Sequence, residues 1–212
     1  MTSPVKWPEM KRGLVAILRG ITPDEVEGVA EVLIETGFEA LEIPLNSPDP
    51  FASIERVAKR FGGRALIGGG TMLTVGDVDR VRDAGGLLMV SPNMRPQVIG
   101  HAVARGMVTM PGVLTPTEAF DALDAGAAGL KFFPASLMGP GGLSALMAVL
   151  PKGTVVGAVG GVGPDNMAEY MRAGVTTFGL GTSVYRPGET AAIVRGKAQA
   201  LITAFDSASQ AG

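Results

Sequence analysis

The sequence Ala125-Gly126-Ala127-Ala128-Gly129-Leu130-Lys131-Phe132-Phe133-Pro134 contains the pattern that decides the fold. Gly126, suited to the left-handed position after a helix, is followed by a short apolar run that ends at a proline. The same order of helix end, glycine and apolar strand recurs at residues 36–43, 84–90, 105–110 and 173–180. With Gly62-Gly63 and Gly153 filling the gaps, the pattern repeats roughly every 20 to 27 residues, which is the length of one βα unit.

This repeat predicts an α/β fold in which eight strands alternate with eight helices. We expect the strands at residues 14–18, 39–43, 65–69, 87–90, 107–110, 129–133, 154–159 and 176–180. Two helix starts carry the capping-box arrangement, at Thr22-Pro23-Asp24-Glu25 and Thr115-Pro116-Thr117-Glu118. Near-continuous apolar strands favour a parallel sheet, and eight units favour closure as a (β/α)8 TIM barrel.

The whole chain, residues 1–212, is interpreted as one such domain. Residues 1–13 are expected to cap the bottom of the barrel and to include a short N-terminal helix. A long alanine-rich helix is expected over about residues 189–206. The small, polar residues 207–212 are expected to form a frayed tail.

The composition limits the class of protein. Hydrophobic residues make up 46% of the chain and charged residues 18%, with a formal net charge of −2, so there is no basic excess for nucleic acid. No window approaches the roughly 18 apolar residues of a membrane span, and the N-terminus has no apolar signal region. The chain has no cysteine and one histidine, which excludes cysteine nucleophiles and argues against a histidine-based zinc site. We expect a cytoplasmic protein without nucleic-acid or membrane partners.

Lys131 is unusual because lysine is rarely buried in an apolar run. Burial disfavours the charged amine, and a neutral amine can attack a carbonyl carbon to form a Schiff base. Strand alternation directs Glu42 and Arg19 to the same barrel interior, at the end where barrel enzymes build their sites. Glutamate can shuttle protons there, and arginine can grip a carboxylate. The alternatives are a lysine whose amine reaches water, or a purely structural ion-pair cluster.

Glycine-rich turns follow the seventh and eighth predicted strands, where phosphate-binding barrels hold their ligand. Their backbone N–H groups are candidates for a phosphate cradle, formed by Gly160, Gly161, Val162, Gly181, Thr182 and Ser183. Glycine also serves tight turns, so the pattern alone does not separate the two roles. The sequence has no P-loop, and nucleotide hydrolysis therefore has no support.

Six segments, taken together, resemble a known family in their order and spacing. They read AILRGI (16–21), EIPLNS (42–47), GGGT (68–71), SPN (91–93), LKFFP (130–134) and VGGV (159–162). They are similar to the class I 2-keto-3-deoxy-6-phosphogluconate/6-phosphogalactonate aldolases along nearly the whole chain. The resemblance implies reversible cleavage of a phosphorylated keto-deoxy sugar acid into pyruvate and D-glyceraldehyde 3-phosphate. It also implies a homotrimer that needs no metal or other cofactor.

The resemblance assigns roles to individual residues. Lys131 matches the Schiff-base lysine, and Glu42 matches the general acid/base. Arg19, Thr71 and Pro92 match positions that hold the keto acid, and the two glycine-rich turns match the phosphate end.

Within the family, two positions favour the galactonate branch and are the candidates for substrate specificity. Asn46 stands where the gluconate branch usually has arginine, and Val159 stands where that branch tends to have threonine. A third difference, Gly69 where alanine is common, has no interpretation at the level of sequence.

Several alternative functions stay open. The chain could act on the gluconate epimer by the same mechanism. It could be an isomerase or a thiamin-phosphate synthase-like enzyme on a similar barrel, since fold alone does not separate these. A Mg²⁺-dependent pyruvate aldolase would need two converging acidic ligands, and only Glu42 is found. A non-catalytic sugar-phosphate sensor would have no reason to keep both Lys131 and Glu42.

Overall fold

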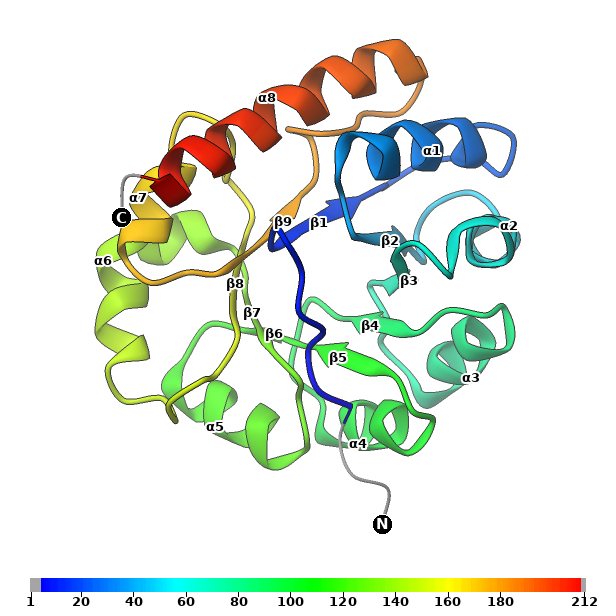
Figure 1. Cartoon of the computed structure of the whole chain (residues 1–212). Helices are drawn as coiled ribbons and strands as arrows, with labels where there is room; N and C mark the ends of the chain where they lie inside the picture. The colour runs from blue at the N-terminus through cyan, green and yellow to red at the C-terminus, as the bar shows by residue number, and fades with distance from the viewer. Residues whose placement is uncertain (1–4, 211–212) are drawn as a thin grey trace.

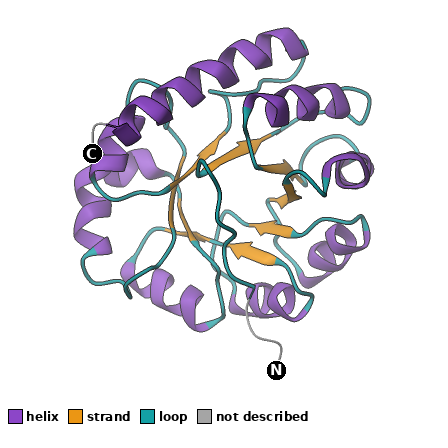
Figure 2. Ribbon diagram, viewed as in Figure 1, coloured by secondary structure: helices purple, strands orange, loops and turns teal. Residues whose placement is uncertain are grey.

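A computed structural model describes residues 5–210 of the chain. Nine parallel strands form one sheet at its centre, and eight helices surround them (Figures 1 and 2). The strands are β1 (Leu14–Ile17), β2 (Ala40–Pro44), β3 (Leu66–Gly70), β4 (Leu88–Val90), β5 (Val108–Met110), β6 (Gly112–Val113), β7 (Leu130–Phe132), β8 (Val156–Val159) and β9 (Thr177–Leu180). The helices are α1 (Val26–Thr36), α2 (Pro50–Phe61), α3 (Val75–Asp83), α4 (Pro96–Ala104), α5 (Pro116–Asp124), α6 (Ala135–Met147), α7 (Met167–Arg172) and α8 (Ala191–Gln210).

The sheet order is β5-β4-β3-β2-β1-β9-β8-β7-β6, which gives a nearly closed α/β barrel of the TIM type. The expected count of eight strands becomes nine because β5 and β6 lie on either side of Pro111. Proline has no backbone N–H and interrupts a ladder. β5 pairs with β4, and β6 pairs with β7. The two short strands together therefore take the place of the fifth expected strand, between β4 and β7.

The helix boundaries follow the local signals in most places. Thr115 and Glu118 form the predicted capping box at the start of α5, and Gly37 ends α1 with φ of 115°. At the other predicted box, Glu25 accepts hydrogen bonds from the N–H and hydroxyl of Thr22, but residues 23–25 form a turn and α1 begins only at Val26. No helix within residues 5–210 is long and apolar enough to cross a membrane.

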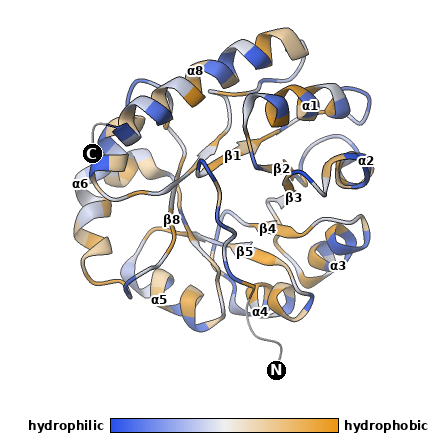
Figure 3. Cartoon of the chain, in the orientation of Figure 1, coloured by the Kyte–Doolittle hydropathy of each residue, from blue (hydrophilic) through white to orange (hydrophobic). Residues whose placement is uncertain are grey.

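Alternation along the strands separates two apolar regions. Outward-facing residues such as Leu41, Leu130 and Phe132 pack with the helices in the larger core. Inward-facing residues of four strands form a second cluster inside the barrel, made of Val15, Ala40, Leu88, Val90, Val108 and Met110. Figure 3 shows the apolar strands at the centre and the mixed polarity of the surrounding helices.

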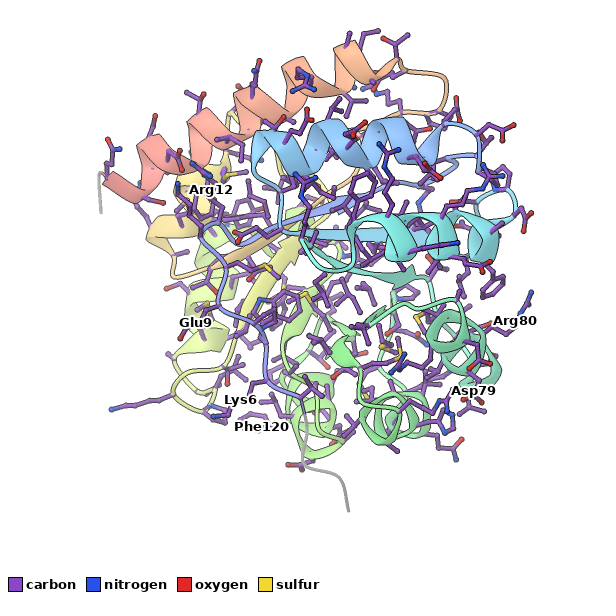
Figure 4. The ribbon with its side chains drawn as sticks, turned by 45° about the vertical axis from the view of Figure 1, so that its right-hand side comes forward. Lys6, Glu9, Arg12, Asp79, Arg80 and Phe120 are labelled. Carbon is purple, nitrogen blue, oxygen red and sulfur yellow. The ribbon has the colours of Figure 1, made fainter. Side chains whose placement is uncertain are left out.

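The described part of the N-terminal segment packs against the barrel, but not as a helix. Residues 5–13 form no helix, so the predicted N-terminal helix is wrong for the described part of this segment, and residues 1–4 lie outside the described residues. Trp7 and Met10 instead pack against the cluster inside the barrel. Pro8 lies between them and cannot donate a backbone hydrogen bond, which favours an extended path. Figure 4 labels Lys6, Glu9 and Arg12 along this segment.

The C-terminal helix is longer than expected. Helix α8 runs to Gln210, so residues 207–210 are helical rather than frayed, and residues 211–212 lie outside the described residues. Two contacts hold this end of the helix. The ring of Phe205 meets that of Phe178 edge-on at 6.3 Å, and Asp206 accepts two hydrogen bonds from Arg12.

Candidate active site

Glu42 and Lys131 both point into the barrel, where strand alternation predicts them. Glu42 lies in the middle of β2 and Lys131 in the middle of β7, and their side chains are only 2% and 5% exposed. Both border a small hollow among apolar residues inside the barrel, lined also by Val15, Ile17, Val90, Met110, Val159 and Gly179. The fold therefore brings together a buried amine and a buried carboxyl from strands that are far apart in sequence.

Burial moves both groups toward their uncharged forms. Desolvation lowers the pKa of Lys131; the nearby Glu42 carboxylate raises it, and the Arg19 guanidinium lowers it further. Desolvation also raises the pKa of Glu42, while the positive charges of Lys131 and Arg19 lower it. One carboxyl oxygen of Glu42, Oε2, is buried with no hydrogen-bond partner among the described residues. The pair can thus supply a nucleophilic amine and a mobile proton.

A cavity of about 370 Å³ adjoins this hollow and shares Lys131, but not Glu42, with it. Its lining consists of Ile17, Arg19, Lys131, Phe133, Val159, Gly160, Gly161, Val162, Gly179, Gly181, Thr182 and Ser183. The volume lies within the range of small-ligand sites. Lys131 lies at its base, and the two glycine-rich turns form another part of its wall, so the cavity joins the amine to the predicted phosphate cradle.

Arg19 lies at the rim of this cavity rather than inside the barrel. It follows β1, and its guanidinium donates a hydrogen bond of 2.5 Å to Oδ1 of Asn46. Its side chain is exposed at the cavity rather than buried beside Glu42, but it shares the cavity lining with Lys131, and its charge acts on both Lys131 and Glu42. β1 ends at Ile17, two residues earlier, so strand alternation no longer governs position 19.

The turn after β8 has a specific internal structure. Gly160 and Gly161 both adopt positive φ, 91° and 82°. The Asn166 side chain accepts from the Gly163 N–H at 3.0 Å and donates to the Gly161 carbonyl at 2.8 Å. The Ser136 N–H donates to the Gly160 carbonyl. These bonds give the carbonyls of both glycines hydrogen-bond partners within the protein.

Two other predicted positions lie at the same end of the barrel but outside this cavity. Thr71 follows β3 with φ of 57°, in the left-handed region that non-glycine residues rarely adopt, and Pro92 follows β4. Neither lines the cavity above Lys131, and neither does Asn46, which contacts Arg19 at the rim. Backbone strain of this kind concentrates at functional sites.

Two residues near the site were not among those predicted. Phe133 lines the cavity, with Lys131 Nζ 5.1 Å from the centre of its ring. Its position two residues after Lys131 was the available signal, because alternate residues of a strand share a face. Nothing in the sequence pointed to Asn166, because it bonds to backbone groups of a turn and every residue has such groups.

No group of three or more histidine, aspartate or glutamate side chains within residues 5–210 is arranged to hold a metal ion. The metal-dependent alternative therefore gains no ligand set from the described part of the chain.

A buried amine and a buried carboxyl inside a barrel, next to a glycine-lined cavity, are suited to amine-based chemistry on a carbonyl compound. Comparison with known proteins agrees. Residues 9–199 match the sequence profile of the family described as KDPG and KHG aldolase, and the chain belongs to this family of aldolases, which are lyases.

The curated relatives include both branches of this family. A probable 2-dehydro-3-deoxy-6-phosphogalactonate aldolase of Rhizobium meliloti (strain 1021) is 57% identical over 96% of each chain. The 2-dehydro-3-deoxy-6-phosphogalactonate aldolase of Escherichia coli (strain K12) is 46% identical over 97% of this chain and 100% of its own. A 2-dehydro-3-deoxy-phosphogluconate aldolase of Treponema pallidum (strain Nichols) is 32% identical over 74% of this chain and 76% of its own.

Solved structures of similar fold include members of the same family. A native KDPGal structure superposes with a TM-score of 0.95 at 46% identity, covering 97% of this chain and 100% of that one. A cube-shaped protein cage designed by fusing symmetric oligomeric domains matches with a TM-score of 0.93 at 46% identity, over 95% of this chain and 74% of that one. A KDPG aldolase from Legionella pneumophila, with pyruvate captured as a covalent carbinolamine, matches with a TM-score of 0.81 at 25% identity, over 90% and 94%.

Proposed function

We propose that this chain, folded as a single barrel domain, cleaves 2-dehydro-3-deoxy-6-phospho-D-galactonate reversibly into pyruvate and D-glyceraldehyde 3-phosphate. The observation that carries the proposal is the burial of Lys131 with Glu42 next to a cavity that extends to the glycine-rich turns. Pyruvate held as a covalent carbinolamine in the Legionella pneumophila relative supports amine chemistry in this family.

In the proposed mechanism, neutral Lys131 attacks C2 of the keto acid, and loss of water gives a protonated imine. The imine accepts the electron pair of the C3–C4 bond when Glu42, directly or through a water, removes the proton of the C4 hydroxyl. Glyceraldehyde 3-phosphate leaves, and Glu42 returns a proton to C3 of the pyruvate enamine. Hydrolysis of the imine then releases pyruvate, and no metal is required as electron sink.

Binding in this proposal divides between the two ends of the cavity. Arg19, at the rim and beside Asn46, is suited to gripping the carboxylate through parallel hydrogen bonds. Thr71 and Pro92 at the ends of β3 and β4 are proposed to complete the keto-acid side. The phosphate is proposed to bind the turns formed by Gly160, Gly161, Val162, Gly181, Thr182 and Ser183, all of which line the cavity.

Val159 removes one hydrogen bond that could select the gluconate epimer. This residue lines the cavity and offers only methyl groups where a threonine would offer a hydroxyl. A site that does not hydrogen-bond a substrate hydroxyl in one configuration loses little when that configuration is inverted. The gluconate epimer stays the second candidate, because the phosphogluconate aldolase of Treponema pallidum is also a relative.

We also propose that the protein assembles as a homotrimer. A structural relative at 46% identity was designed into a cage by fusing symmetric oligomeric domains. Several large apolar side chains are exposed on the surface of this chain, including Leu137 at 73% and Val149 at 61%. Subunit interfaces commonly cover such side chains where they gather into one patch.

The decisive experiment is reduction with borohydride in the presence of pyruvate, followed by peptide mass mapping. We expect one reduced pyruvyl adduct, on the peptide that contains Lys131, because only a neutral amine near the keto carbon forms the imine. Lys131→Met should abolish both the adduct and turnover, whereas Lys152→Met, at an exposed position, should change neither. Folded wild-type protein that forms no adduct would overturn the Schiff-base assignment. If the adduct forms, assays with both C4 epimers decide the substrate.

A further inference from the structure

The last residue of β3, Gly70, lies directly against the carboxyl group of Glu42. A Cβ atom at position 70 would fall within the van der Waals radius of Glu42 Oε2 and would lie 2.8 Å from Oε1. All three of the nearest atoms to this position belong to the Glu42 carboxyl. The space that a side chain at position 70 would fill is therefore the space that the carboxyl occupies.

Alternation of β2 and β3 explains this contact. On β3, Leu66 packs with the cluster inside the barrel, whereas Ile67 packs with the outer core, so Gly70 faces inward with Leu66. On β2, Glu42 faces inward, and the two strands are paired in register with Pro44 beside Gly70. Glu42 itself pairs with Gly68, and its side chain reaches along the same face to Gly70, two residues further on.

Space, rather than backbone freedom, explains glycine at this position. The φ of Gly70 is not among the positive values that favour glycine, in contrast to Gly160 and Gly161. The neighbouring residue gives the comparison. A Cβ on Gly69 would point the other way, to Val81 Cγ2 at 2.8 Å and Met72 Sδ at 3.2 Å, behind the sheet. A side chain at position 69 would therefore disturb the packing of the core, whereas a side chain at position 70 would disturb the site.

We propose that Gly70 is a positioning residue for Glu42. Because Gly70 has no side chain, space remains for the Glu42 carboxyl against the barrel wall, near Lys131. The proposal rests on the proposed role of Glu42 in proton transfer. Any side chain at position 70 would displace the carboxyl while leaving the backbone of β3 in place, because the atom that must move is the free end of a side chain. Proton transfer would be lost, but the Lys131 amine would stay in place and could still form an adduct.

The test is Gly70→Ala, with exchange of the pyruvate methyl protons in D₂O followed by NMR. We expect exchange to fall by at least about 10²-fold, the low end for loss of general acid–base catalysis. The borohydride adduct on Lys131 should still form on long incubation, and the melting temperature should remain near that of the wild type. Gly69→Ala, the matched control, should retain exchange, because its methyl group faces Val81 and Met72.

A double substitution separates positioning from a merely structural effect. If Gly70 acts through Glu42, Gly70→Ala should cause little further loss in the Glu42→Gln background, whereas independent effects would multiply. Wild-type exchange in Gly70→Ala, or full multiplication in the double variant, would overturn this proposal while leaving the proposed function intact. A wild-type protein that neither exchanges nor forms an adduct would overturn the proposed function itself.

Discussion

Glu42 and Lys131 illustrate how burial sets the chemistry of a single residue. Each is held in apolar surroundings that disfavour its charged form, so the pKa of the amine is lowered and that of the carboxyl is raised. The two residues also oppose this effect in one another, because each charged form would stabilise the other. Burial and mutual attraction therefore act in opposite directions on the pKa of each group.

The first prediction at this scale concerns Glu42→Gln. Gln keeps the shape of the side chain but cannot take up or release a proton, so exchange of the pyruvate methyl protons should slow by at least about 10²-fold. Glu39→Gln, the same substitution just before β2, is the control; Glu39 accepts a hydrogen bond from the Arg12 backbone N–H and lies outside the site. Exchange at the wild-type rate in Glu42→Gln would give Glu42 a structural role only.

The same variant should also change the pH dependence of imine formation. The Glu42 carboxylate raises the pKa of Lys131, so its removal should lower that pKa further and extend the neutral amine to lower pH. We therefore expect the acid limb of the rate of adduct formation to move to lower pH in Glu42→Gln. A shift to higher pH would contradict the electrostatic coupling of the two residues.

At the scale of elements, the turn between β8 and α7 depends on one side chain. Asn166 bonds both to the Gly163 N–H and to the Gly161 carbonyl, and so fixes a turn with two consecutive positive φ angles. An asparagine can satisfy both a donor and an acceptor at once, which alanine cannot. The orientation of the N–H groups proposed to bind phosphate thus depends on a residue that lies outside the cavity lining.

Asn166→Ala should therefore weaken binding of the phosphorylated substrate and leave the chemistry at Lys131 unchanged. Loss of the two bonds should raise KM about tenfold, the equivalent of about 1.4 kcal/mol. Exchange of the pyruvate methyl protons, which needs no phosphate, should stay at the wild-type rate. Equal losses in both assays would show that the turn supports the whole site and is not specific to the phosphate.

At the scale of the whole molecule, the two ends of the chain are joined at one side of the barrel. Arg12, in the N-terminal segment, makes two hydrogen bonds of 2.7 and 2.6 Å to Asp206 on α8, and Figure 4 shows Arg12 beneath that helix. The Arg12 guanidinium lowers the pKa of the Asp206 carboxyl. The segment that covers the barrel bottom and the last helix thus support one another, away from the site.

The prediction at this scale is the mass of the protein in solution. A homotrimer should give three times the 21.7 kDa of the chain by light scattering coupled to gel filtration. Leu137→Glu changes one of the most exposed apolar positions. If this surface lies at the interface between subunits, the variant should have a lower mass in solution than the wild type. A wild-type mass of one chain at micromolar concentration would contradict the proposed assembly.

The sequence by itself determined the alternation of strands and helices, and hence the barrel. The signals were local: a glycine in the left-handed conformation at Gly37 and Gly126, the capping box at Thr115, and apolar strands of period two. Because parallel strands carry their carboxyl ends to one edge, the same local pattern also indicated that Lys131 and Glu42 would meet. The family resemblance came from the same segments.

Tertiary structure alone decided how the site is completed. The contact of Gly70 with Glu42 joins two strands, and the bonds of Asn166 join the side chain to turn carbonyls, so neither leaves a pattern in the sequence. Arg19 lies at the rim because β1 ends early, and the N-terminal segment is extended because Trp7 and Met10 pack into the barrel. Local propensity sets which elements form, whereas these features depend on which atoms meet after the barrel closes.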